Sequence, residues 1–168
     1  VPSLKISAGP ESITIPLLIV EGDARLNDQV LGANFKLLAL KTGINIKDGK
    51  LNIPKFAGTG KLNRGVDRQI MSEGRLEFRG GSGRLTRQPI RIGGARGNIP
   101  FQWPPSDKPG KGTVYINNIT FGNMKLGSIH SEVRQTTAGF RFKGRHQSAL
   151  LPRLKSRFSG WSSLLGKG

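Results

Sequence analysis

The side chains that could perform acid-base or metal chemistry are few in this chain. His130 and His146 are its two histidines. Neither lies in an H-x-x-x-H spacing or beside a pair of carboxylates, as a metal site or an acid-base pair would require. The chain has no cysteine, which excludes thiol catalysis, disulfides and zinc ribbons. The sequence therefore predicts a protein that is not an enzyme and uses neither metal nor cofactor.

One segment has some features of a phosphate-binding loop. Gly60 and Lys61 match part of the G-x-x-x-x-G-K-S/T pattern, but that pattern requires glycine at position 55 and a hydroxyl at position 62. The chain has Lys55 and Leu62 there. The flanking residues also alternate as strands do, with no helix pattern after the glycine. We therefore expect no nucleotide site in this segment.

The chain is strongly basic and the charge is uneven. It has 27 Lys and Arg against 10 Asp and Glu, a formal net charge of +17, and no acidic residue after Glu132. Such a charge indicates a polyanionic partner or an anionic surface such as lipid headgroups. The residues that we expect to contact anionic headgroups lie in the C-terminal part: Arg141, Lys143, Arg145, Arg153, Lys155 and Arg157.

A series of arginines in the middle of the chain supports a second hypothesis, nucleic-acid binding. Phosphate binding would require these side chains on one continuous surface, with aromatic platforms if the ligand is single-stranded. Aromatic residues are few in this region, and a solvated face explains the charges more simply. The series comprises Arg64, Arg68, Arg75, Arg79, Arg84, Arg87, Arg91 and Arg96.

The clearest structural signal is a β-hairpin around Asp48-Gly49. Alternating apolar residues precede and follow this pair, and Asp-Gly is typical of a two-residue type I′ turn. That turn would oppose Ile46 to Leu51 and Ile44 to Ile53. These four residues would then share one dry face, with lysines and asparagines on the wet face.

The same alternation recurs along most of the chain and predicts an all-β fold of antiparallel hairpins in sequence order. One further hairpin is expected around Gly80 to Gly83, and another joins Ile129–Gln135 to Phe140–Gly144. Residues 1–168 are expected to form one domain, a piece of a larger protein, with a possible division near 100–112. The residues expected on the apolar face are Ile44, Ile46, Leu51, Ile53, Leu76, Phe78, Val114, Ile116, Phe140 and Phe142.

The C-terminal segment, residues 148–168, has a different pattern. Leu151, Leu154, Phe158, Trp161 and Leu165 recur at spacings of three and four residues. This spacing predicts a short amphipathic helix with basic residues on its other side, of the kind that lies at a membrane interface.

Two blocks of the sequence resemble bacterial AsmA-like envelope proteins, and within them the YdbH-like proteins. The first block runs from Gly43 to Leu62, and the second from Gly112 to Ile129 with its Leu-Gly-x-Ile cadence. The segments Ile99–Pro104 and Arg134–Phe140 are similar to pieces near the C-terminal regions of YdbH-like proteins. The resemblance covers about residues 43 to 150.

The resemblance implies a periplasmic β-sheet, anchored to the inner membrane through a segment outside this chain, whose apolar groove carries phospholipid toward the outer membrane. It transfers no active-site residue. We therefore expect a lipid-binding module, with phospholipid or an anionic membrane surface as partner and other envelope proteins at the sheet edges. A nucleic-acid-binding β-domain and a structural component of a secretion apparatus are the alternatives. The sequence leaves open whether the sheet forms an open groove or closes into a sandwich.

Overall fold

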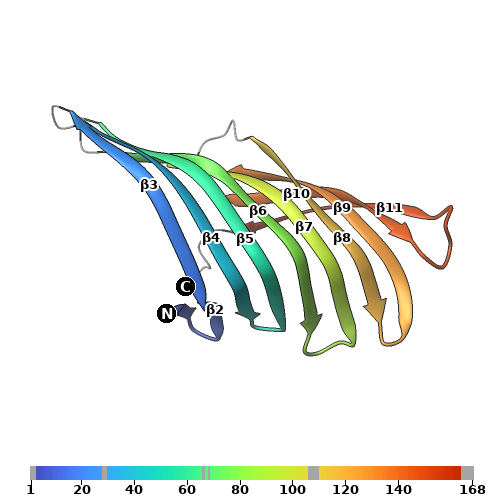
Figure 1. Ribbon diagram of the computed structural model, residues 1–168. Helices are drawn as coiled ribbons and strands as arrows, with labels where there is room; N and C mark the ends of the chain where they lie inside the picture. Colours follow the sequence, from blue (N-terminus) through green and yellow to red (C-terminus); the bar gives the residue numbers. More distant parts are fainter. Residues whose placement is uncertain (1–2, 28–29, 66, 68, 106–109, 164–168) are drawn as a thin grey trace.

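The computed structural model describes residues 3–27, 30–65, 67, 69–105 and 110–163, and its elements are all strands (Figure 1). The strands are β1 (Leu4–Ala8), β2 (Glu11–Ile15), β3 (Leu17–Asn27), β4 (Val30–Ile46), β5 (Gly49–Arg64), β6 (Ile70–Leu85), β7 (Ile90–Trp103), β8 (Lys111–Phe121), β9 (Met124–Thr136), β10 (Gly139–Ser148) and β11 (Lys155–Ser163).

These strands form one antiparallel sheet in which the order follows the sequence. The order is β1-β2-β4-β5-β6-β7-β8-β9-β10-β11, and β3 pairs with β4 beside this path. The sheet is curved and does not close on itself (Figure 1). The predicted all-β, hairpin-built fold is confirmed, and of the two alternatives the sheet is an open one.

Strands β2 and β3 lie end to end along the same edge of β4. Strand β3 pairs with residues 30–40 of β4, and β2 pairs with residues 43–45. Pro16 separates them, in agreement with the missing N–H that keeps proline out of a sheet ladder.

The Asp-Gly hairpin is present, but its turn lies one residue earlier than predicted. Lys47 and Asp48 form the turn, so Ile46 opposes Gly49 and Ile44 opposes Leu51. Gly49 is the first residue of β5 and lies under Ile46 and Leu85, where a Cβ atom would be 3.2 Å from Leu85 Cδ2. Because the register differs by two residues, the apolar residues still share one face.

The glycines from Gly80 to Gly83 do not form a turn. Strand β6 continues through them, with a register shift against β7 between Phe78 and Gly83. Gly80 has φ +75°, and left-handed residues also occur on three other strands, at Lys41, Gly94 and Gly127. These positions form a line across the sheet that we call the crease.

At the crease, the less exposed residues of a strand change from odd-numbered to even-numbered positions, or the reverse. On β5, Leu51 and Ile53 are half-buried before Pro54, and Phe56 and Gly58 are the less exposed positions after it. The left-handed residue Lys41 of β4 lies opposite Pro54, between the pairs Leu40–Lys55 and Thr42–Ile53, and an irregularity of this kind changes the face to which the following side chains point. We infer that the change of parity keeps the apolar side chains on one side of the sheet along its whole length.

The predicted C-terminal helix is wrong for the described residues, because 155–163 form strand β11. Leu165 lies outside the described residues. Strand β11 covers the open edge of β10, pairing Arg145 with Arg157 and Gly144 with Phe158. The backbone hydrogen bonds of that edge outweigh a helix pattern interrupted by Gly160.

The sheet is a single layer and buries few large side chains. Among the described residues, the buried hydrophobic ones are Ala39, Ala95, Ile119 and Val133. A sandwich would bury the larger apolar residues of one face between two layers. The apolar face of this sheet is therefore uncovered by the described chain.

Candidate functional site

The residues predicted for the apolar face are arranged on one side of the sheet. Phe142 opposes Val133, and Phe140 opposes Gln135, so these pairs share a face. Every predicted residue remains at least partly exposed, and Ile46 is 39% exposed. The apolar face is defined here as the predicted set together with Phe35, Leu37, Ile92, Ile99, Phe101, Ile119 and Val133.

Aromatic rings of the apolar face lie over glycines of the neighbouring strand. Phe35 directly opposes Gly60, and Phe101 directly opposes Gly74. A Cβ atom on Gly60 would be 2.5 Å from Phe35 Cζ, and one on Gly74 would be 2.7 Å from Phe101 Cζ. Each glycine therefore leaves room for the ring beside it, as in the pairing of aromatics with sheet glycines.

The same arrangement recurs elsewhere on this face. Phe78 opposes Gly97, and Phe158 opposes Gly144, and in both pairs a Cβ atom on the glycine would overlap the ring. Rings that lie down on the sheet add apolar surface without filling the space above it. The result is a shallow apolar trough.

The Phe35 and Phe101 rings come together above the two strands that separate their own. They belong to β4 and β7, and three strand spacings separate those strands by about 14 Å in a flat sheet. Their ring centroids are 6.4 Å apart. Each ring lies one strand inward, over Gly60 on β5 or Gly74 on β6, and this accounts for the short distance.

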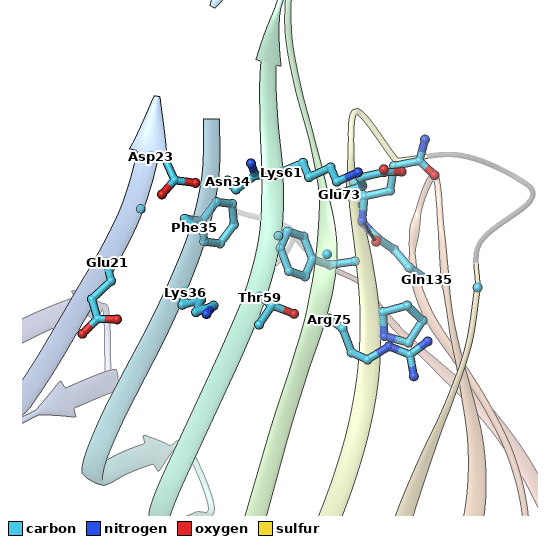
Figure 2. A pocket seen from close by; sticks show the side chains of 17 residues that line it. Glu21, Asp23, Asn34, Phe35, Lys36, Thr59, Lys61, Glu73, Arg75 and Gln135 are labelled. Carbon is cyan, nitrogen blue, oxygen red and sulfur yellow. Dashed lines mark hydrogen bonds between the residues drawn. The ribbon is translucent and has the colours of Figure 1, made fainter. Parts of the chain in front are cut away.

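Next to these rings is a hollow of about 710 Å³, which we call the Phe35 hollow (Figure 2). Ligand pockets in proteins commonly measure about 300 to 1,000 Å³. Phe35 and Phe101 of the apolar face line it, together with Gly60, Gly74 and Gln135, which lie on the same side of their strands.

The charged residues that line the hollow belong to the alternate positions of the same strands. Glu21 opposes Lys36, and Lys61 opposes Glu73. Because successive side chains point to opposite faces, these positions belong to the face opposite Phe35. Cross-strand neighbours of opposite charge stabilise a sheet, and here they do so behind the hollow.

Gln135 links two strands across the beginning of β8. Pairing of β7 with β8 ends at Asn98 and Thr113, so the outer edge of the last residues of β7 lacks a strand partner there. The Gln102 N–H donates to Gln135 Oε1 at 2.7 Å, and Gln135 Nε2 donates to the Gln102 carbonyl oxygen at 2.9 Å. Gln135 is 5% exposed. Its amide therefore holds β9 against β7 at one end of the hollow.

The predicted headgroup residues lie on the other face of the sheet or in a turn. Arg141 opposes Arg134, Lys143 opposes Glu132, and Arg145 opposes Arg157, all at positions that alternate with Phe140 and Phe142. Lys155 is two residues before Arg157 on β11 and therefore lies on the same face, and Arg153 lies in the turn before β11. We call the face that carries these side chains the basic face.

Like charges oppose one another in rows on the basic face. Lys111 opposes Arg134, which opposes Arg141, and Arg145 opposes Arg157. A second row joins three strands farther along the sheet, with Lys50 opposite Arg84 and Arg84 opposite Arg91. Directly opposed like charges destabilise a sheet, so these rows need a reason other than folding.

Glu132 lies beside the first of these rows, two residues before Arg134 on β9 and opposite Lys143. Arg134 Nε is 2.6 Å from Glu132 Oε1, and Lys111 Nζ is 3.9 Å from Oε2. The hydrogen bond from Arg134 lowers the pKa of Glu132, and the charges of Arg134, Lys111 and Lys143 act in the same direction. Its ionised carboxylate offsets part of the local positive charge.

The histidines are placed on strands. The His130 ring stacks on Tyr115, with centroids 4.3 Å apart and an interplanar angle of 11°, and the Arg96 guanidinium lies 5.1 Å from the centre of the Tyr115 ring. His146 Nε2 is 3.2 Å from the Leu126 carbonyl oxygen. Within the described part of the chain, no group of three His, Cys, Asp or Glu side chains could hold a metal ion.

Sequence reasoning missed Phe35, Phe101 and Gln135. Phe35 and Phe101 alternate with polar residues, but their proximity depends on the register that places Gly60 and Gly74 between them. Gln135 ends a strand whose other positions have the expected alternation, and a polar residue there gave no signal of a cross-strand link. Arg68 of the arginine series lies outside the described residues.

No protein-family model, curated protein or solved structure matches the chain. Among the described residues, no helix is long and apolar enough to span a membrane.

Proposed function

We propose that this chain is a non-enzymatic, lipid-binding module of a cell envelope protein that takes part in phospholipid transport between the inner and outer membranes. The observation that carries the proposal is the uncovered apolar face. A concave surface of this kind lies open in a layer whose buried apolar residues are few. A continuous apolar surface that is exposed on a protein favours binding of an apolar partner.

Acyl chains suit the trough because they are flexible, linear and fully apolar. Rings lie over glycines at several places along the face, so the trough floor is shallow and apolar. The Phe35 hollow offers the deepest part, and the charged residues of its lining alternate with the Phe35 and Phe101 positions along their strands. The AsmA-like resemblance supports the same class of cargo, a periplasmic location and an anchor outside this chain.

The apolar face and the basic face are on opposite sides of the sheet, and this affects where lipid headgroups would lie. Basic side chains of the basic face point away from acyl chains in the trough, so they cannot hold the headgroups of the same lipids. They suit a separate anionic surface instead, at about 1 kcal/mol per basic residue near a charged membrane.

The proposal is tested by lipid extraction and mass spectrometry of the purified chain. We expect phospholipid to co-purify, and Leu76→Glu or Phe142→Glu to abolish retention because each places a charge on the apolar face. Asn52→Glu is the matched control, since Asn52 alternates with Leu51 and Ile53, lies between Gly43 and Ser82 on the other face, and does not line the hollow. Repeated purification without lipid, or equal loss in the control, would overturn the proposal.

A second function, binding of a polyanion such as nucleic acid, is favoured by the rows of like charge. Lys50, Arg84 and Arg91 form one such row, and arginines of the middle series alternate onto the basic face. Phosphates would relieve the repulsion between them. The Tyr115 and His130 rings stack on each other, so their shared faces are not free for bases. Steeply salt-dependent binding of a single-stranded oligonucleotide would support this function, and its absence would remove it.

A further inference from the structure

The connection between β10 and β11 exposes aliphatic side chains. We call residues 149–154 the leucine turn. Leu150 is 58% exposed, Leu151 is 61% exposed and Leu154 is 53% exposed. A cluster of exposed large apolar residues in one short turn is unlike the scattered single residues of an ordinary soluble surface.

The leucine turn is ordered by hydrogen bonds at its base. The Leu154 N–H donates to the Leu151 carbonyl at 2.8 Å, and the Leu151 N–H donates to Ser148 Oγ at 3.1 Å. Gln147 Nε2 donates to the Pro152 carbonyl at 2.5 Å. The Ala149 N–H donates to Leu126 at 3.0 Å and joins the base to β9. The turn therefore presents its leucines from a fixed backbone, so little ordering would accompany binding.

Basic residues surround the leucine turn. Arg153 lies within it and Lys155 follows, while Arg145 and Arg157 oppose each other on the two strands. Arg157 is three residues beyond Leu154, a distance of about 10 Å along a strand. None of the ion pairs found in the described residues involves these side chains. No acidic residue follows Glu132 in the sequence.

We propose that the β10–β11 hairpin docks on an anionic phospholipid bilayer, with the leucine turn inserted at the interface and the basic residues among the headgroups. An apolar tip with a basic rim matches both layers of such an interface, and the spacing places Arg145 and Arg157 at headgroup depth. This inference rests on the proposed function for its partner, a phospholipid membrane, and adds the element that meets it. It does not require lipid in the trough.

The test is flotation of the full chain with vesicles of phosphatidylcholine alone or with about one third phosphatidylglycerol. We expect binding to the anionic vesicles and a decrease with added salt. Leu150→Ser with Leu151→Ser should reduce binding by at least about tenfold. Arg145→Gln with Arg157→Gln should reduce it by roughly 30-fold, about fivefold for each charge.

The matched controls lie at the other edge of the sheet. Val20→Ser with Leu26→Ser removes similar apolar groups, at positions 64% and 73% exposed, and Lys5→Gln with Arg25→Gln removes two exposed charges from β1 and β3. Both controls should bind as the natural chain does. Equal loss in the controls, or no binding of the natural chain, would overturn the inference. Binding to an oligonucleotide with none to vesicles would also overturn it and favour the polyanion function.

The lipid content of the same preparations separates this inference from the proposed function. Hairpin variants should retain co-purified lipid while losing vesicle binding. A chain that binds vesicles but never carries lipid would remove the cargo function and leave the docking hairpin intact.

Discussion

The Phe35 ring occupies the space that a side chain on Gly60 would need. The two residues are direct cross-strand partners, and a Cβ atom on Gly60 would also lie 2.7 Å from the Glu73 carbonyl oxygen. The backbone of β6 and the ring of β4 thus confine the same point from two sides. This relationship explains why the floor of the trough contains glycines at positions where a strand ordinarily has a larger residue.

Gly60→Ala should therefore destabilise the fold and displace the Phe35 ring. Overpacking of a confined site costs about 1–3 kcal/mol. Gly43→Ala is the control, because a Cβ atom there meets nothing within 4 Å. It should leave the free energy of unfolding unchanged or raise it by about 0.5–1 kcal/mol. Urea unfolding of both variants gives the comparison, and equal stabilities would contradict the confinement of Gly60.

Replacement of Gln135 by Leu should loosen the link between β9 and β7. The Gln102 N–H and carbonyl would lose their partners at a partly buried place, at a cost of about 1 kcal/mol. Hydrogen exchange of the Gln102 amide should accelerate more than exchange in the middle of β5. Gln88→Ala, at an exposed position, is the control and should change neither quantity. Unchanged protection of Gln102 in Gln135→Leu would show that the link contributes nothing.

Arg84→Gln should stabilise the free protein while weakening its binding to anions. The substitution removes the middle cation of the row Lys50, Arg84 and Arg91. Relief of directly opposed like charges contributes roughly 0.2–1 kcal/mol. Arg75→Gln is the control, because Arg75 lies between Thr59 and Pro100 and its Nη1 donates to Asn98 Oδ1 at 3.0 Å. It should not be stabilising. Thermal unfolding at low salt measures the difference, which should shrink as salt is added.

Glu132→Gln should remove a contribution to stability that depends on pH. The hydrogen bond from Arg134 lowers the pKa of Glu132 in the folded chain from its ordinary value of 4.5. A carboxyl whose pKa is lower in the folded chain than in the unfolded chain stabilises the fold at pH values above its unfolded pKa. This contribution disappears as the pH falls through its folded pKa. The natural chain should therefore exceed the variant in stability at neutral pH and lose this advantage below about pH 4. A constant difference across that range would contradict the assignment.

The sequence predicted which residues share a face more reliably than it predicted turns. Ile44 and Leu51 share a face in either register, because side-chain alternation has a period of two and the error in the register was two residues. Gly80 to Gly83 has the composition of a turn, but the same glycines serve a bulge within β6, and local composition does not distinguish these uses. Phe35 and Phe101 come together because each ring lies over a glycine of an intervening strand, and this depends on a register between strands that no local pattern encodes.

The helix predicted for the C-terminal segment was wrong for a related reason. Apolar spacings of three and four residues around Phe158 predicted a helix, whereas the open edge of β10 offers a row of backbone partners that only a strand can use. The interaction that decides the structure of this segment is its pairing with β10, a strand outside the segment. Leu151 and Leu154, the first residues of the predicted helix pattern, instead occupy a turn.

The strand order has a consequence for how the chain folds. From β4 to β11 each strand pairs with the next one in the sequence, so the strand pairings join consecutive segments of the chain. Such a topology lowers the entropy that must be lost before contacts form, and favours growth of the sheet one hairpin at a time. A chain that emerges gradually, from a ribosome or through a translocation channel, would then add each hairpin to an existing edge without waiting for its C-terminus.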